Sequence, residues 1–334
     1  MSIITNVSQV KELYAEASGR KWVLPCFCSE NLTTTEAVLQ AAKEYGQERS
    51  MKDVPIMLAI TCNYDHRSQV HNYTFTGDWR TGLRLFMKDI EALADETGFY
   101  RDLRVLVHLD HIQHDLDLEL LEGDLSPYSS IMYDASALPF AENMQKTADF
   151  VQRRNKDIYI EGACDEIVDA TGTQRNELTT PENAKKYASE TGANMIVANL
   201  GTEHRATGKE LKYHSEVTRS IRDVVGEKLV LHGTSSVTSD QVKNLFADGV
   251  CKVNIWTALE RDTAPLLAEE MVKNLSRVGG EPLVERLVRE GYVTPKAQTG
   301  EKIHLAYFTN VYRQKIIYDQ MKQMVKDYLD MWYI

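Results

Sequence analysis

The feature that most constrains the fold of this chain is an eightfold alternation of short apolar runs with segments of helical periodicity. The segments between the runs are mostly typical of amphipathic helices, and several begin at Ser, Thr or Asp and end at Gly. Runs that are apolar almost throughout are typical of parallel strands buried on both faces. The eight runs are WVLPCFC (22–28), VPIMLAI (54–60), RVLVHLD (104–110), SSIMYDA (129–135), DIYIEGA (157–163), NMIVANL (194–200), KLVLHG (228–233) and CKVNIW (251–256).

Eight strand–helix units favour a (β/α)8 barrel over an open doubly wound sheet. No G-x-G-x-x-G or G-x-x-x-x-G-K-[ST] motif follows any run, so the usual signatures of a nucleotide-binding open sheet are missing. We expect one TIM-barrel domain over residues 1–334, with a barrel core at about 20–260 and a helical extension at about 260–334. The extension is rich in Tyr, Met, Ile and Trp, which predicts that it packs on the barrel or on a partner subunit.

The net charge and the hydropathy of the chain limit the kinds of molecule that it can be expected to bind. A net charge of -11 and a pI near 5.4 argue against binding to nucleic acid or to an anionic membrane surface. No apolar run approaches the roughly 20 residues that span a bilayer. Five cysteines, an odd number that mostly lie within apolar runs, indicate reduced and packed thiols. We therefore predict a cytoplasmic protein whose substrate is a small molecule.

Polar residues gather where the predicted strands end, and this edge of a barrel supplies the reacting groups. Three histidines, His111, His204 and His232, follow three different strands, so their imidazoles can converge on one point. Three imidazoles with an open fourth position form a catalytic zinc site. A single histidine at a strand end is more often structural, so the prediction depends on all three. The other polar residues at this edge are Asp110, Asp134, Ser136, Glu161 and Asn254, while His108 lies inside its run and is expected to be core.

Five motifs, in order along the chain, resemble those of the class II, zinc-dependent fructose- and tagatose-bisphosphate aldolases. VLVHLDH (105–111) resembles the family's His-x-Asp-His strand, and IMYDASALPFAEN (131–143) its Asp-Gly-Ser-x-Leu-Pro-Phe-x-x-Asn segment. NLGTEH (199–204) is similar to the Gly-Thr-Ser-His turn. LVLHGTSS (229–236) is similar to the Leu-His-Gly-Gly-Ser-Gly loop, and VCKVNIWTAL (250–259) to the Lys-Ile-Asn-[IV]-Asp-Thr-Asp-Leu strand. The chain thus looks like a divergent member of this family.

The resemblance implies a role for each matching residue. His111, His204 and His232 would bind Zn2+ or another divalent metal, with a monovalent cation as a further candidate cofactor. Asp110 would be the catalytic acid/base. Substrate or phosphate oxygens would be held by Gly233, Ser235, Asn254 and Thr257. Glu161, Asp134 and Ser136 are candidates for supporting positions behind the metal ligands. The family also implies a homo-oligomer, a dimer or tetramer.

Three departures from the family pattern affect the expected substrate. Ala163 replaces the second Glu of the family's strand-five motif, so a second carboxylate is missing unless Asp165 or Glu166 takes its place. Arg205 replaces a Gly after the second metal histidine, and either binds a carboxylate or phosphate of the substrate or forms a surface ion pair. Trp256 replaces an Asp and either contacts the sugar or packs in the core. These changes argue against fructose 1,6-bisphosphate itself as the substrate.

Three functions are consistent with these residues. The first is a metal-dependent lyase, an aldolase that cleaves a phosphorylated ketose or a related sugar acid, in which the metal stabilises the enediolate and Asp110 transfers the proton. The second is an epimerase of sugars or sugar phosphates that uses the same site. The third is an inactive relative that binds a sugar phosphate or a partner protein. Retention of three histidines and Asp110 favours an enzyme, and product analysis by NMR separates an aldolase from an epimerase.

Overall fold

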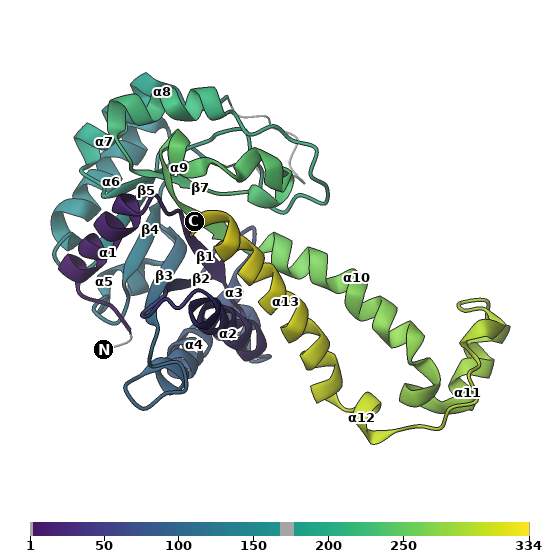
Figure 1. The fold of residues 1–334 in the computed structure, drawn as a ribbon. Coiled ribbons are helices and arrows are strands. Elements are labelled where there is room, and N and C mark those ends of the chain that lie inside the picture. Colours follow the sequence, from purple (N-terminus) through teal and green to yellow (C-terminus); the bar gives the residue numbers. More distant parts are fainter. Residues whose placement is uncertain (1–2, 168–176, 334) are drawn as a thin grey trace.

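A computed structural model, which describes residues 3–167 and 177–333, shows eight parallel strands closed into a barrel (Figure 1). Each strand pairs with its neighbours in sequence, and β1 pairs with β8 to close the ring. The expected TIM barrel is therefore confirmed. The strands are β1 (Leu24–Cys28), β2 (Pro55–Thr61), β3 (Arg104–Gln113), β4 (Ser130–Asp134), β5 (Tyr159–Ala163), β6 (Met195–Val197), β7 (Leu229–Leu231) and β8 (Val250–Ile255).

Helices surround the barrel and pack their apolar faces on the strands, as expected for strands that are buried on both sides. The chain starts with α1 (Val7–Gly19), which precedes the first strand. The helices between strands are α2 (Leu32–Glu48), α3 (Gln69–Asn72), α4 (Trp79–Ala94), α5 (Leu118–Glu122), α6 (Phe140–Arg154), α7 (Pro181–Thr191), α8 (Ser215–Val225) and α9 (Leu245–Asp248), with 3-10 turns η1 (Thr234–Ser236) and η2 (Ser239–Val242).

The barrel interior contains a buried charged cluster as well as apolar side chains. Lys252 on β8, Glu161 on β5 and His108 on β3 are all 0% exposed. The Lys252 ammonium lies 2.7 Å from Glu161 Oε1 and 3.1 Å from His108 Nε2. The pKa of Lys252 is raised because the charge of Glu161 outweighs the effect of burial. The ion pair therefore stays charged inside the barrel, below the mouth formed by the strand ends.

The C-terminal extension forms four helices, α10 (Thr257–Lys273), α11 (Leu275–Arg289), α12 (Leu305–Phe308) and α13 (Asn310–Trp332), with a 3-10 turn η3 (Pro295–Ala297). Figure 1 shows α10 leaving the barrel and α13 returning to it beside α2. The end of α13 is anchored on the barrel, because Trp332 Nε1 donates to the Val242 carbonyl and the Tyr333 hydroxyl donates to the Pro55 carbonyl. Packing of the extension on the barrel, one of the two predicted possibilities, thus holds for this end.

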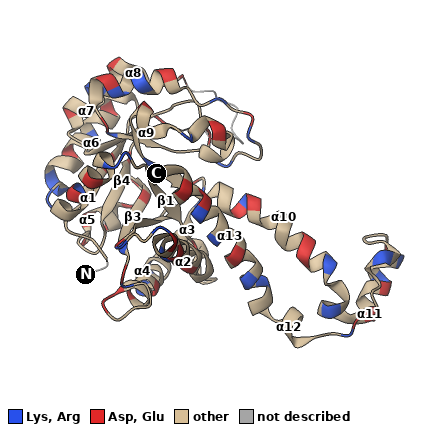
Figure 2. Ribbon diagram, in the orientation of Figure 1, with Lys and Arg blue, Asp and Glu red and all other residues tan. Residues whose placement is uncertain are grey.

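The remainder of the extension projects away from the barrel as an arm, defined here as residues 265–312 (Figure 1). Figure 2 shows acidic and basic residues both distributed along it. Helix α11 is kinked at Gly280, whose φ of +76° is left-handed. Among the described helices, none is long and apolar enough to cross a membrane.

Candidate functional site

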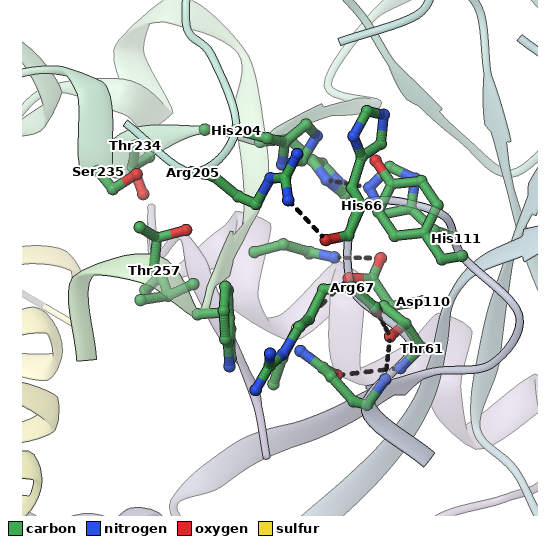
Figure 3. A pocket seen from close by; sticks show the side chains of 18 of the residues that line it. Thr61, His66, Arg67, Asp110, His111, His204, Arg205, Thr234, Ser235 and Thr257 are labelled. Atoms are coloured by element: carbon green, nitrogen blue, oxygen red, sulfur yellow. Dashed lines mark hydrogen bonds between the residues drawn. The ribbon is translucent and has the colours of Figure 1, made fainter. Parts of the chain in front are cut away.

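The mouth of the barrel contains a pocket lined by the ends of β1, β2, β3, β7 and β8 and by the loop after β6 (Figure 3). Its lining includes most of the residues selected from the sequence, together with several from the β2–α3 loop. The lining residues from the sequence predictions are Asp110, His111, His204, Arg205, His232, Gly233, Ser235, Asn254 and Thr257.

The three predicted histidines meet in this pocket. Their ligand nitrogens all lie within 4.8 Å of one another. The His111 Nε2 and His232 Nδ1 atoms are 3.1 Å apart. Two nitrogens bound to a tetrahedral zinc at about 2.0–2.1 Å are separated by about 3.4 Å, so this spacing is close to that of a metal site. All three imidazoles line the pocket. The donor set therefore fits a divalent metal that accepts imidazole ligands.

A break in the regular geometry of β3 brings His111 into the pocket. Alternation along a strand would direct Asp110 and His111 to opposite faces. The register between β3 and β4 shifts between Leu109 and Ile112, and His111 has a left-handed φ of +47°. A β-bulge of this kind redirects a side chain. His108 and Asp110 therefore face the barrel interior with regular spacing, and the bulge adds His111 to the same side.

Neighbouring side chains fix the orientation of the His111 imidazole. His111 Nδ1 lies 2.7 Å from Asp134 Oδ2, while Asp134 Oδ1 accepts hydrogen bonds from the Ser136 backbone and hydroxyl. A carboxylate behind a metal histidine fixes the ring and leaves the other nitrogen for the metal. Tyr64 stacks on the His111 ring at 4.2 Å. The Thr202 hydroxyl donates to the His232 carbonyl at 2.6 Å, which connects the β6 and β7 loops.

The electrostatic environment of the histidines favours a positive charge in the pocket. Burial lowers the pKa of His232 well below its ordinary range, so its imidazole is neutral at pH 7. Burial opposes a charge on His111, but Asp110 and Asp134 outweigh it and raise the pKa of His111. The pKa of Asp134 falls to about 2, because its interactions with His111 and Ser136 outweigh burial. Two carboxylates thus face the histidines and can balance the charge of a cation.

Asp110 lies beside the histidines and has a defined set of contacts. Its Oδ1 accepts a hydrogen bond from Asn254 Nδ2 at 2.7 Å, and its Oδ2 accepts one from the Cys28 thiol at 3.3 Å. Burial favours the protonated acid, but the charge of His111 and the interaction with the His108 side chain outweigh it and hold the pKa of Asp110 well below its usual value. Asp110 is therefore an ionised carboxylate that can accept a proton.

Loops after β6 and β7 form the side of the pocket that suits an anion. Gly233 has a φ of +69°, and a Cβ at this position would lie 2.7 Å from the Glu203 carbonyl oxygen, so only glycine fits. It is followed by the 3-10 turn Thr234–Ser236. Arg205 has a φ of +52°, a strained conformation for a residue that replaces glycine, and its Nη1 donates to the His66 carbonyl at 3.1 Å. Arg205 thus lines the pocket, and its guanidinium is held there in part by the His66 carbonyl.

The three residues predicted to support the metal ligands do not all lie behind them. Asp134 and Ser136 lie behind His111 as described, whereas Glu161 lies deeper and pairs with Lys252. Of the two candidates to replace the carboxylate missing at Ala163, Asp165 accepts a hydrogen bond from Thr179 at 2.5 Å. Glu166 lines an adjoining cavity with Asp134 and Ser136.

Sequence reasoning missed several residues that line the pocket, among them Cys28, Tyr64 and Arg67, and also Lys252, which lies below it. The signal for Lys252 was a lysine in the middle of an otherwise apolar strand, VCKVNIW. Tyr64 and Arg67 lie in the polar and aromatic β2–α3 loop, whose composition is typical of loops over a barrel mouth. All five cysteines are buried and unpaired, in agreement with the prediction of reduced thiols.

The chain is an eight-stranded barrel with three histidines spaced to hold a metal ion and a buried carboxylate at the C-terminal ends of its strands, an arrangement found in TIM-barrel enzymes. Within this class, residues 8–332 match the family model described as Fructose-bisphosphate aldolase class-II, and the chain belongs to that family.

Solved structures with the same fold include three that cover nearly all of this chain. A fructose-bisphosphate aldolase from Campylobacter jejuni has 18% identity and a TM-score of 0.75, over 99% of this chain and 95% of that one. The YdjI aldolase from Escherichia coli K12 has 17% identity and a TM-score of 0.62, over 96% and 95%. A putative fructose-1,6-bisphosphate aldolase from Coccidioides immitis has 22% identity and a TM-score of 0.64, over 96% and 94%. At these identities the likeness supports the fold alone.

Proposed function

We propose that this protein is a metal-dependent aldolase that reversibly cleaves a phosphorylated ketose or a related sugar acid. The observation that carries the proposal is the convergence of His111, His204 and His232, whose ligand nitrogens lie within 4.8 Å of one another, in the same pocket as the ionised Asp110. Membership of the class II aldolase family supports the same reaction class.

Asp110 accounts for the proton transfer at the C4 hydroxyl. It takes this proton while the C3–C4 bond breaks; C4 becomes the aldehyde carbon, the electron pair of the bond passes to the ketose fragment as an enediolate, and a proton from solvent at C3 completes the ketone product. In the condensation direction Asp110 returns this proton to the new hydroxyl. Asn254 and Cys28 hold the carboxylate in place through both of its oxygens. Zn2+ or another divalent ion, held by the three imidazoles, supplies a Lewis acid beside the developing negative charge.

The substrate's phosphate is proposed to lie against the β6 and β7 loops. Gly233 and Ser235 offer a backbone turn at the pocket wall, and Arg205 adds a positive charge at the same side. Thr257, at the start of α10, supplies a hydroxyl from the opposite side of this turn.

Metal analysis and a cleavage screen test this function together. We expect about one zinc per chain by mass spectrometry, reduced in both His204→Ala and His232→Ala. Ketose phosphates incubated with the zinc-loaded protein should release a triose-phosphate fragment that NMR detects. Stereochemical inversion without fragments would support the epimerase instead. A protein that holds no zinc after zinc is supplied would contradict the mechanism.

We further propose that the arm forms a contact between two copies of the chain. Among the described residues, six of thirteen exposed large apolar side chains lie on it: Val272, Tyr292, Ile303, Leu305, Phe308 and Val311. The arm contains six Lys or Arg and six Asp or Glu, whereas the whole chain has a net charge of -11. Two copies can therefore meet at the arms without the repulsion that opposes contact elsewhere.

Light scattering tests this contact. Leu305→Glu with Val311→Glu should convert an oligomer to a folded monomer, because a charge on an apolar interface is costly to bury. Phe75→Glu, at a fully exposed residue outside the arm, is the matched control and should leave the oligomer unchanged. A monomeric wild-type protein at micromolar concentration would refute the proposal.

A further inference from the structure

Trp256 lines the pocket and carries a buried hydrogen-bond donor. It follows β8 directly, precedes α10, and lines the pocket with Asp110 and His111. Its indole Nε1 is buried and has no acceptor among the described residues. An indole N–H can only donate, and a buried donor without an acceptor costs free energy comparable to a lost hydrogen bond. Since the ring lines the pocket, a ligand there is the natural source of the acceptor.

The indole is held in place by its neighbours. The Arg67 guanidinium lies over the ring, 4.9 Å from its centroid. Arg67 is itself fixed by Glu30, since its Nε donates to Glu30 Oε2 at 3.0 Å and its Nη2 donates to Oε1. A cation–π contact between a paired guanidinium and an indole limits rotation of the ring. The N–H direction is therefore set before a ligand binds.

The part of the pocket around Trp256 and Arg67 does not favour an anion. The positive charge of Arg67 is balanced by Glu30, which is buried. Glu260 lies nearby, and its pKa is raised by burial and by the charge of Glu30. A phosphate placed here would meet two acidic residues and one cation that is already paired. The anion-binding features instead lie on the β6 and β7 loops, at Arg205 and Gly233.

The strand that leads to Trp256 also contacts Asp110. Asn254, two residues earlier on β8, donates to Asp110 Oδ1 at 2.7 Å, and its own Oδ1 is buried without a partner among the described residues. In the proposed reaction, Asp110 takes the proton of the hydroxyl that becomes the aldehyde. The part of the substrate that leaves as the aldehyde therefore lies close to Asp110 and Trp256.

We propose that Trp256 determines specificity: its indole N–H donates a hydrogen bond to an uncharged hydroxyl or carbonyl oxygen on the aldehyde half of the substrate. The inference rests on the proposed aldolase function. It assigns the substrate class as a ketose with one acidic group, at the end that faces Arg205, and a neutral hydroxylated chain at the other end.

Aldehyde selectivity in the condensation direction tests the proposal. The zinc-loaded protein is given dihydroxyacetone phosphate with glyceraldehyde, propionaldehyde or glyceraldehyde 3-phosphate. The wild type should prefer glyceraldehyde to both others in kcat/KM. Trp256→Phe keeps an aromatic ring but removes the N–H, and should lower the preference for glyceraldehyde over propionaldehyde about 10- to 100-fold. Its KM for dihydroxyacetone phosphate and its zinc content should not change, and Trp79→Phe, outside the pocket, is the control.

Two results would overturn the inference: an unchanged glyceraldehyde-to-propionaldehyde ratio in Trp256→Phe, or a wild type that prefers the phosphorylated aldehyde. A wild type that condenses no aldehyde would instead refute the aldolase function. In that case a binding measurement tests the role of Trp256 without turnover. The indole N–H signal of Trp256 is followed by NMR in 15N-Trp-labelled protein and is assigned by its absence in Trp256→Phe. That proton should move downfield with glyceraldehyde and not with propionaldehyde, and no movement with either would refute the hydrogen bond.

Discussion

At the scale of single residues, the part of the site that the sequence did not predict depends on local irregularities of the backbone. His111, His204 and His232 could be selected from the sequence as metal ligands because each follows a predicted strand. Their convergence with Asp110 depends on the bulge at His111, whose left-handed φ is uncommon for any residue other than glycine and is not marked by the surrounding sequence. Strain of this kind is concentrated at functional sites. The role of Arg67 was equally hidden, because it depends on contacts with Glu30 and Trp256, which are distant in sequence.

Substitution of the proposed acid/base is the sharpest test at this scale. Asp110→Asn keeps the shape of the side chain but removes its ability to accept a proton, so turnover should fall by about 10²-fold or more. Zinc content and thermal stability should remain close to those of the wild type. Asp115→Asn, at an exposed carboxylate four residues beyond His111, is the matched control. Equal turnover of Asp110→Asn and the wild type would remove Asp110 from the mechanism.

The buried ion pair below the site makes a second prediction. Lys252→Met leaves Glu161 as an uncompensated charge in the barrel, and should lower the free energy of unfolding by about 3–5 kcal/mol. Addition of Glu161→Gln removes that charge, so the double variant should recover much of the loss. Urea unfolding of the two single variants and the double variant measures this coupling. Purely additive losses would show that the two charges do not stabilise each other.

At the scale of elements, the periodicity of the sequence predicted strand positions well and strand ends less well. The predicted run 194–200 contains the observed β6, but only Met195–Val197 pairs as a strand. The residues after it turn into the loop that carries His204, and an apolar Ala-Asn-Leu sequence does not mark that change. Conversely, β3 extends to Gln113, beyond the predicted end at Asp110, because pairing with β4 resumes after the bulge. Tertiary pairing, not local composition, sets these boundaries.

The end of α13 is expected to be essential for stability. Trp332 is 2% exposed, stacks with Tyr328 and donates to the Val242 carbonyl at 2.8 Å. Trp332→Ala removes this contact and leaves a cavity, so the free energy of unfolding should fall by about 3–5 kcal/mol. Phe75→Ala, which removes an exposed ring, should change it by less than about 0.5 kcal/mol. Similar urea midpoints for the two variants would contradict this assignment.

At the scale of the whole molecule, the proposed metal site couples the fold to its ligand. The three histidines come from β3, from the loop after β6 and from the residue after β7, so closure of the barrel is required to bring them together. An unfolded chain offers no such arrangement. Metal that binds only the folded barrel must stabilise it by RT ln(1 + [L]/Kd), about 4 kcal/mol when free zinc exceeds Kd 1,000-fold.

Removal of the metal should therefore destabilise the whole barrel in one transition. We expect a chelator to lower the melting temperature of the zinc-loaded wild type by several degrees, and added zinc to restore it. In His204→Ala the same treatment should have little effect, because two imidazoles hold the ion much less tightly than three. His304→Ala, at an exposed histidine in the arm, should respond as the wild type does. A chelator effect of equal size in His204→Ala and the wild type would place the stabilising metal elsewhere, since loss of a true ligand must weaken the link between binding and folding.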